Sequence, residues 1–144
     1  MEAVLARTVG TEERAPGSLP AAISRHVVRL VADYTGRGPT KARTTIRDNV
    51  VICITEDNMT KAEQRLVQEG ESELVVTIRR RFQQTMKDDL VGGIEVLTGR
   101  KVISFLSDHN AHTDHAVEGF VLDGPPDMAA LPVEEHAADT PGSP

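Results

Sequence analysis

Hydrophobic residues recur along the first half of the chain with two different periods, one typical of helices and one of strands. Between residues 18 and 36 the apolar side chains follow helical spacing, after a start in which Ser18 can cap the helix and Pro20 suits its first turn. Gly36 and Pro39 end this pattern, because a proline disfavours the helical conformation in the residue before it. The sequence therefore predicts a helix from Ser18 to Gly36, followed by a loop.

Two runs rich in β-branched residues come next, residues 41 to 47 and 50 to 55. The Asp48-Asn49 pair between them tolerates the positive φ of a two-residue hairpin turn. Alternation along the second run places apolar side chains on both faces, which is typical of a strand inside a sheet. We expect an antiparallel hairpin with Cys53 buried in its second strand and unreactive, and with Arg43 on the wet face of its first strand.

Two helices are predicted in the middle of the chain. Thr60 and Glu63 have the spacing of a capping box, which would start a short helix that runs to about Glu69. After Gly70 a long helix is expected from about Glu73 to Thr98-Gly99. Its apolar side chains stand at every fourth position, at Leu74, Ile78, Phe82, Met86, Leu90 and Ile94.

The four-residue spacing of the long helix predicts a partner. Each step of four residues turns by about 400°, so the apolar ridge winds round the helix, and one sheet cannot cover all of it. The Gly92-Gly93 pair would allow another backbone to approach closely. We therefore expect a homodimer whose interface includes this helix around Met86, Leu90, Gly93 and Ile94. The alternative is packing within one chain, with the glycines under a strand.

The last two elements are strands, Lys101 to Ser107 and Ala116 to Leu122, joined by a polar connection from Asp108 to His115. Together the elements predict an α+β fold of order α-β-β-α-α-β-β, with helices on one face of an antiparallel sheet of two hairpins. This domain would span residues 18–122. Residues 1–17 and the acidic, Pro-rich residues 123–144 lack a helical or strand period, so both are expected to be disordered tails.

Charge and composition exclude several classes of function. Of the formal net charge of −6, residues 1–17 carry −1 (three Glu, two Arg) and residues 123–144 carry −5 (five carboxylates, no Lys or Arg), which leaves the domain neutral. Neutrality argues against nucleic acid as a partner. The single cysteine precludes an internal disulfide and indicates a cytoplasmic protein. The longest apolar run, Val50 to Ile54, is far shorter than the ~20 residues that span a bilayer, so we expect no membrane insertion.

A basic cluster is the first candidate site. Arg37, Lys41, Arg43 and Arg47 lie around two glycines, and guanidinium groups bind carboxylate, bicarbonate or phosphate through paired hydrogen bonds. The alternative is a helix stop followed by an ordinary charged strand. A second basic run, Arg79-Arg80-Arg81, spreads around its helix and is expected to be a solvated face with local Glu partners.

Three histidines in the last connection are the second candidate. His109, His112 and His115 alternate with two aspartates, and such ligands could hold zinc. Their three-residue spacing in a connector fixes no geometry, so the alternative is a polar turn with incidental histidines. We expect neither a metal nor another cofactor.

Several ordered blocks carry a resemblance to a known family: Gly36 to Thr44, Ile46 to Ile54, Leu66-Val67, Arg79 to Gln83, Leu97 to Val102, Ser107-Asp108 and Ala116 to Leu122. Over roughly residues 18–122 the chain resembles the MpsC-like family of small bacterial domains. The resemblance implies a soluble accessory to the membrane subunits of a sodium-coupled system that generates membrane potential. Because it supplies no catalytic residue, we expect a non-catalytic accessory or regulatory domain of a membrane ion or bicarbonate system. The alternative is a small-anion sensor or enzyme that uses the Arg37 to Arg47 surface.

Overall fold

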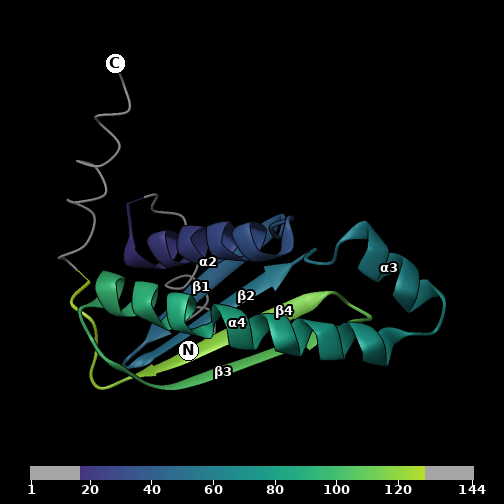
Figure 1. Cartoon of the computed structure of the whole chain (residues 1–144). Coiled ribbons are helices and arrows are strands. Elements are labelled where there is room, and N and C mark those ends of the chain that lie inside the picture. The colour runs from purple at the N-terminus through teal and green to yellow at the C-terminus, as the bar shows by residue number, and fades with distance from the viewer. Residues whose placement is uncertain (1–16, 129–144) are drawn as a thin grey trace, which may run out of the picture.

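The structure, a computed structural model, describes residues 17–128 as three helices and a four-stranded antiparallel sheet. The elements are, in chain order, α2 (Leu19–Thr35), β1 (Lys41–Arg47), β2 (Val50–Glu56), α3 (Lys61–Gln68), α4 (Ser72–Thr98), β3 (Val102–Asn110) and β4 (His115–Leu122). The strand order β1-β2-β4-β3 joins the two hairpins through β2 and β4 (Figure 1). This architecture confirms the predicted α+β fold and the order of its elements.

Local signals place the ends of α2 and of the first hairpin as the sequence predicts. The Ser18 hydroxyl accepts a hydrogen bond from the amide of Ala21 at 3.2 Å. Gly36 adopts a left-handed conformation with φ of 83° and ends the helix. Asp48 takes the positive φ, 54°, that the tight turn between β1 and β2 requires.

The capping box of α3 is also present. The amide of Glu63 donates to the Thr60 hydroxyl at 3.2 Å, and the amide of Thr60 donates to the Glu63 carboxylate at 2.8 Å. Both bonds satisfy amide groups that a helix start leaves without partners. The long helix α4 then runs over 27 residues and ends at Gly99, so both predicted helices are confirmed.

The predicted polar connection between the last two strands is wrong in its bounds. β3 continues to Asn110 and β4 begins at His115, so that only residues 111–114 form the turn. His109 pairs with Ala116 on the face of the hairpin that packs against the helices, while Asp108 pairs with Val117 on the other face. Alternation therefore continues through the polar stretch, although its composition is typical of a loop.

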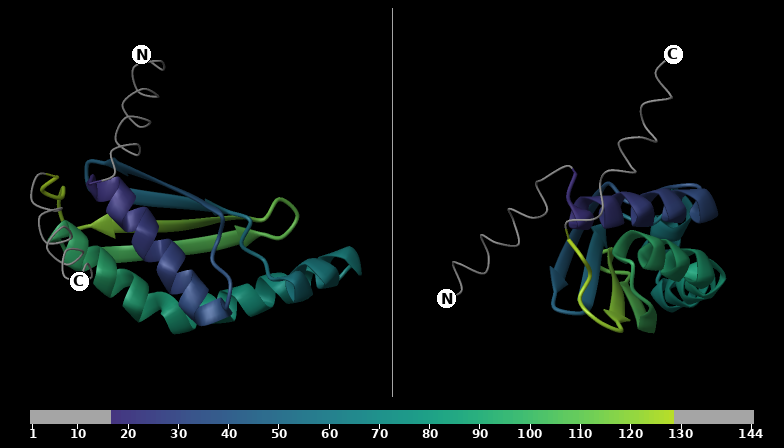
Figure 2. Two further views of the ribbon diagram at one scale, coloured as in Figure 1. Left: turned by 90° about the horizontal axis from the view of Figure 1, so that it is seen from above. Right: turned by 90° about the vertical axis from the view of Figure 1, so that its left-hand side faces the viewer.

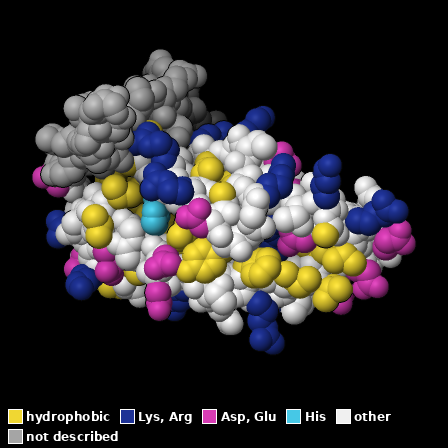
Figure 3. All heavy atoms as spheres, turned by 45° about the horizontal axis from the view of Figure 1, so that its top comes forward, with side chains coloured by type: hydrophobic (Ala, Val, Ile, Leu, Met, Phe, Trp, Pro, Cys, Tyr) yellow, Lys and Arg dark blue, Asp and Glu magenta, His cyan; other side chains and the backbone are white. Residues whose placement is uncertain are grey.

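Two helices cover one face of the sheet, and the core lies between them and the strands. Figures 1 and 2 show α2 and α4 side by side on this face, with α3 beyond the end of the sheet. On the side that carries the helices, Figure 3 shows charged side chains of both signs with hydrophobic ones between them. The core is formed by buried side chains from α2, α4, β2 and β4. They include Leu19, Ile23, Val27, Val51, Cys53, Met86, Leu90, Ile94, Phe120 and Leu122.

The residues predicted to form a dimer interface on the long helix belong to the core of the single chain. Met86, Leu90 and Ile94 are buried against α2 and the sheet. Gly93 faces the ring of His26 in α2, so closely that a Cβ atom would overlap the ring. The predicted location of the interface is therefore corrected, because this part of α4 is already covered by α2. The homodimer itself stays a prediction.

The apolar ridge of α4 winds round the helix, so in the first half of the helix its side chains do not point into the core. Leu74 is exposed and Phe82 is only half-buried, while Val75 and Arg79 take the inward positions. The aromatic ring at the centre of the core is that of Phe120, which is fully buried. The inward face of the first half of α4 is therefore mixed: Val75 packs in a small second apolar cluster with Met59 and Ala111, while Arg79 and Gln83 bring polar groups to the groove described below.

The predicted tails, 1–17 and 123–144, lie mostly outside the described residues. Within the described part, the amide of Asp123 donates to the carbonyl of Lys101 at 2.9 Å, and Arg100 Nε donates to the carbonyl of Pro125 at 2.8 Å. Within residues 17–128, no helix combines the length and the apolarity needed to cross a bilayer.

Candidate functional site

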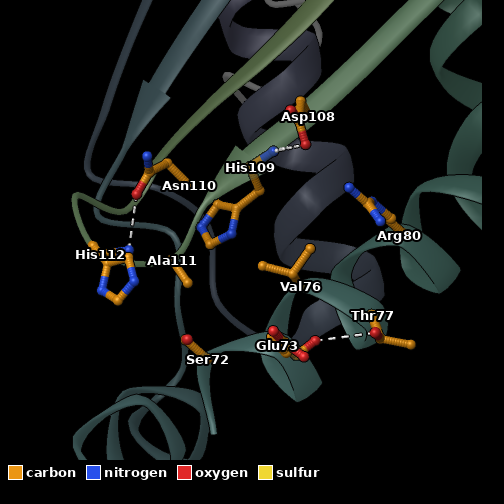
Figure 4. A pocket seen from close by; sticks show the side chains of 10 residues that line it. All are labelled: Ser72, Glu73, Val76, Thr77, Arg80, Asp108, His109, Asn110, Ala111 and His112. Atoms are coloured by element: carbon orange, nitrogen blue, oxygen red, sulfur yellow. Dashed lines mark hydrogen bonds between the residues drawn. The ribbon is translucent and has the colours of Figure 1, made fainter. Parts of the chain in front are cut away.

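A groove runs between the first half of α4 and the edge strand β3. It consists of two adjoining hollows of ≈ 470 and ≈ 270 Å³ that share Val76, Arg80, Asp108 and His109. Figure 4 shows Val76 and Arg80 extending from α4 toward His109 and Asp108 on β3. The second hollow continues along α4 past Gln83 to Lys87. We call the two hollows together the α4–β3 groove.

A buried ion pair lies beside this groove and fixes α3 against α4. Arg79, 5% exposed, donates through Nε and Nη2 to the two carboxylate oxygens of Glu63 at 3.0 and 2.6 Å. Its Nη2 also donates to the carbonyl of Asn58 at 2.8 Å. The prediction that Arg79 lies on a solvated face is therefore wrong. Arg79 lies on the same side of the helix as the buried Met86, and its ion-pair partner Glu63 belongs to α3. Arg80 and Arg81 are exposed, as predicted.

Asp114 ties the tip of the second hairpin to the loop before α3. Its Oδ2 accepts the amides of Asn58 at 2.9 Å and Met59 at 3.0 Å, and its Oδ1 lies 2.8 Å from His109 Nε2. Since an ionised carboxylate only accepts, His109 donates from Nε2, and its Nδ1 accepts a hydrogen bond in a neutral ring and donates one in a protonated ring. That Nδ1 atom is buried and has no hydrogen-bond partner among the described residues.

Glu118 lies in the middle of β4 and faces α4. It is 2% exposed, and Gln83 Nε2 donates to its Oε2 at 2.9 Å. Burial raises the pKa of Glu118 to about 7, against the opposing effects of Ser107, Gln83 and the positive charge of Arg79. Four buried side-chain atoms in this region have no partner at hydrogen-bond distance among the described residues: Glu118 Oε1, Gln83 Oε1, Ser107 Oγ and His109 Nδ1. Gln83, Ser107 and His109 line the groove, so three of these atoms belong to its lining, while Glu118 lies behind Gln83 and Ser107.

Comparison with known proteins assigns the chain to a family. The family model described as "Na+-translocating membrane potential-generating system (MpsC)" matches residues 15–124. The chain belongs to the MpsC family. It is also similar to the uncharacterized protein YbcI of Bacillus subtilis (strain 168), with 27% identity over 113 residues, which cover 76% of this chain and 90% of YbcI. No solved structure matches it.

The floor of the groove in this MpsC-family domain favours a bound ligand. A buried polar atom without a partner costs ~1–3 kcal/mol, so three such atoms in one place are typical of a site where a ligand or ordered water completes the hydrogen bonds. Gln83 Oε1 accepts a hydrogen bond, the Ser107 hydroxyl donates and accepts, and His109 Nδ1 accepts when the ring is neutral. At the rim Arg80 and Lys87 bring positive charge, and Glu73 and Asp108 bring negative charge. The arrangement suits a small acid that retains an O–H donor.

The structure separates Arg37 from the other three residues of the predicted anion site. Arg37 Nη2 lies 2.9 Å from Asp57 Oδ2, and its Nη1 donates to the carbonyl of Met59 at 3.0 Å. Hydrogen bonds from Thr40 and Arg37 lower the pKa of Asp57. Arg37 therefore holds the loop before α3. The other three residues lie along one exposed face of β1, at Lys41, Arg43 and Arg47.

The three histidines point to different places. His109 faces Asp114 on the helix side of the hairpin, and His112 is exposed in the turn. His115 lies on the opposite face, with Nε2 3.9 Å from the Glu56 carboxylate. Over residues 17–128 the structure brings no three His, Cys, Asp or Glu side chains together in a way that could hold a metal ion.

The sequence analysis missed the groove because its residues come from α4, from β3 and from the turn after β3, which only the folded chain brings together. One signal was present in β4, where Glu118 occupies the same face as Ala116, Phe120 and Leu122. A carboxylate on an apolar strand face indicates a buried acid that needs partners. A second signal was Arg79, which falls on one helical face with Val75 and Met86.

Proposed function

We propose that this MpsC-family domain is a non-catalytic accessory or regulatory domain of a Na+-translocating membrane-potential-generating system, with a small acid bound in the α4–β3 groove as its regulatory signal. The family match over residues 15–124 carries the link to that system. The unpartnered acceptors at the floor of the groove supply the means of regulation. Bicarbonate and hydrogen phosphate both combine negative charge with one O–H donor, so both suit the floor and the rim.

The contacts beside the groove support binding rather than chemistry. The Glu63 carboxylate is held by Arg79 and by the amide of Thr60. The Asp114 carboxylate is held by two backbone amides and by His109. A general base needs a lone pair that can reach a substrate, and Glu63 and Asp114 use theirs to fix α3 and the hairpin. Glu118, whose pKa is raised to about 7, is 2% exposed and does not line either hollow.

The proposed role is tested by measuring membrane potential in cells. A strain without the gene should show a lower potential in a voltage-sensitive dye assay, with a changed dependence on external Na+, and the unmutated gene should restore both. A gene with Arg80→Ala and Lys87→Ala should restore less, while Arg81→Ala, an exposed arginine outside the groove lining, should restore fully. A deletion strain with unchanged potential at every Na+ concentration would contradict the accessory role.

The ligand is tested separately on the purified chain. Millimolar bicarbonate or phosphate should raise the melting temperature, because a ligand that binds only the folded state stabilises it. The rise should be lost in Arg80→Ala and kept in Arg81→Ala. Equal shifts in both variants would place the binding outside the groove.

A second candidate is the anion surface on β1, favoured by the alignment of Lys41, Arg43 and Arg47 on one exposed face. Such a strip would bind a small anion by charge-assisted hydrogen bonds. Titration with phosphate should then weaken in Arg43→Ala and Arg47→Ala but not in Arg81→Ala. The absence of binding in the unmutated chain would end this candidate.

A further inference from the structure

The face of the sheet opposite the helices is more apolar than a face in contact with water. Ile52, Ile103 and Leu106 are 40%, 65% and 62% exposed. Alternation places further apolar side chains around Ile52 and Leu106, at Val50, Ile54, Val117 and Val121. An antiparallel sheet with one wet face normally carries polar residues there, and a continuous apolar area usually marks a partner surface. We call this surface the open face.

The register of the four strands arranges the open face in rows. One row runs Thr45, Ile52, Gly119 and Leu106 across β1, β2, β4 and β3, and the next runs Arg43, Ile54, Val117 and Asp108. The third row runs Lys41, Glu56, His115 and Asn110. The β1 edge is therefore basic, the β3 edge holds Asp108, and the centre is apolar.

A glycine lies at the centre of the open face. Gly119 is buried, and a Cβ atom on it would make ordinary contact with Leu106 at 3.7 Å, so neighbouring side chains already cover the backbone of β4 here. Ile52 pairs with Gly119 from β2. A shallow hollow of ≈ 220 Å³ is lined partly by Ile54, Asp108 and His115 of the adjoining rows.

We propose that the open face packs against the open face of a second copy of this chain, about a twofold axis that runs along the strands between β2 and β4. This axis lays β1 of one copy over β3 of the other, as two sheets pack in a sandwich. Arg43 then faces Asp108 of the second copy across the hollow. In the neighbouring rows Ile52 faces Gly119, and Glu56 faces His115.

Charge decides the direction of the axis. A twofold axis across the strands would instead stack β1 on β1, which would set Lys41, Arg43 and Arg47 against the same three residues. Like charges placed opposite one another disfavour an interface. Within residues 17–128, Arg43 and Asp108 form no ion pair with any other side chain, so both are available to a second copy.

Sedimentation of the full chain tests the interface. At tens of micromolar the unmutated chain should sediment as two copies of 15.6 kDa. Ile52→Lys and Leu106→Lys should each give a single 15.6 kDa species with unchanged circular dichroism, because both side chains are exposed in the single chain. Val96→Lys, at an 83% exposed position on α4, is the matched control and should remain a dimer. A monomeric unmutated chain, or a dimer that neither lysine splits, would overturn the proposal.

A charge exchange tests the axis. Arg43→Asp and Asp108→Arg should each raise the dissociation constant of the dimer by about tenfold, since each sets like charges against one another. The double variant should restore the affinity, because it exchanges the two charges between the copies. If Arg43→Asp alone tightens the dimer, or the double variant is weaker than both single variants, the proposed axis is wrong.

Discussion

The two halves of α4 make different kinds of contact with the rest of the chain. In the second half, Met86, Leu90 and Ile94 meet apolar side chains from α2 and the strands. In the first half, Arg79 and Gln83 meet charged and polar groups from α3, β3 and β4. One continuous helix therefore joins the main apolar core to the proposed groove site, and the difference separates the end that holds the fold from the end proposed to bind a ligand.

Elementary energetics give the two halves different roles. Burial of apolar area stabilises by ~25 cal/mol per Å², without demands on geometry. A buried ion pair gains little net stability, because desolvation offsets the attraction, although loss of one partner is costly. The polar half therefore contributes a defined arrangement of Arg79, Glu63 and Glu118 more than it contributes stability. A ligand site is expected at this end.

The largest effect should come from the apolar half. Phe120→Ala should lower the free energy of unfolding by about 3–5 kcal/mol, because it leaves a cavity beneath α4. Urea denaturation followed by circular dichroism measures the loss. Phe82→Ala is the matched control, and its half-buried ring should cost less than half as much. Equal losses would show that Phe82 is as central to the core as Phe120.

The polar half should respond to charge rather than to volume. Glu63→Gln keeps the capping box, which accepts Gln, but leaves the buried Arg79 guanidinium without a counter-charge. The expected loss of stability is about 3 kcal/mol by urea denaturation. The double variant with Arg79→Met should lose less than Glu63→Gln alone, because it removes both charges. A double variant that loses more would mean that the pair itself stabilises the fold.

The smallest of the three effects concerns pH. The pKa of Glu118 is raised from 4.5 to about 7 in the folded chain, so the folded state binds more protons than the unfolded state between these values. Its stabilising contribution is complete below pH 4.5 and is lost as the pH rises toward 7, by on the order of 3 kcal/mol. Glu118→Gln should therefore be more stable than the unmutated chain at pH 8, and the advantage should vanish near pH 4.5.

The measurement for Glu118 is the difference between the two proteins across this pH range, which cancels the titration of all other groups. A difference in stability that does not vary with pH would show that Glu118 has an ordinary pKa in the folded chain.

Most of the fold could be predicted because its signals are local. The Ser18 cap, the Asp48-Asn49 turn and the Thr60 capping box each depend on residues within three positions of one another. The groove could not be predicted in the same way. Its contacts join Glu63 to Arg79 over 16 residues and Gln83 to Glu118 over 35, and only the folded chain brings them together.

The predicted helix interface failed for a related reason. The apolar ridge on α4 does wind round the helix, as the four-residue spacing predicts. The sequence does not show, however, that α2 packs onto the stretch that was expected to form the interface. The His26 ring against Gly93 occupies the close approach that the glycines permit. The apolar surface left over lies instead on the sheet, where both faces of β2 are apolar.

The position of β4 has a consequence for synthesis on the ribosome. β2 ends at residue 56, but β4, which pairs with its second edge, begins only at His115. The ribosome must therefore add 58 intervening residues before this edge of β2 can be paired. At about 5–20 residues per second this delay lasts roughly 3–12 s. During that time the nascent chain exposes an unpaired strand edge, which is a template for aggregation. Stalled chains that end at residue 110 should therefore bind a chaperone, and chains released after residue 128 should not.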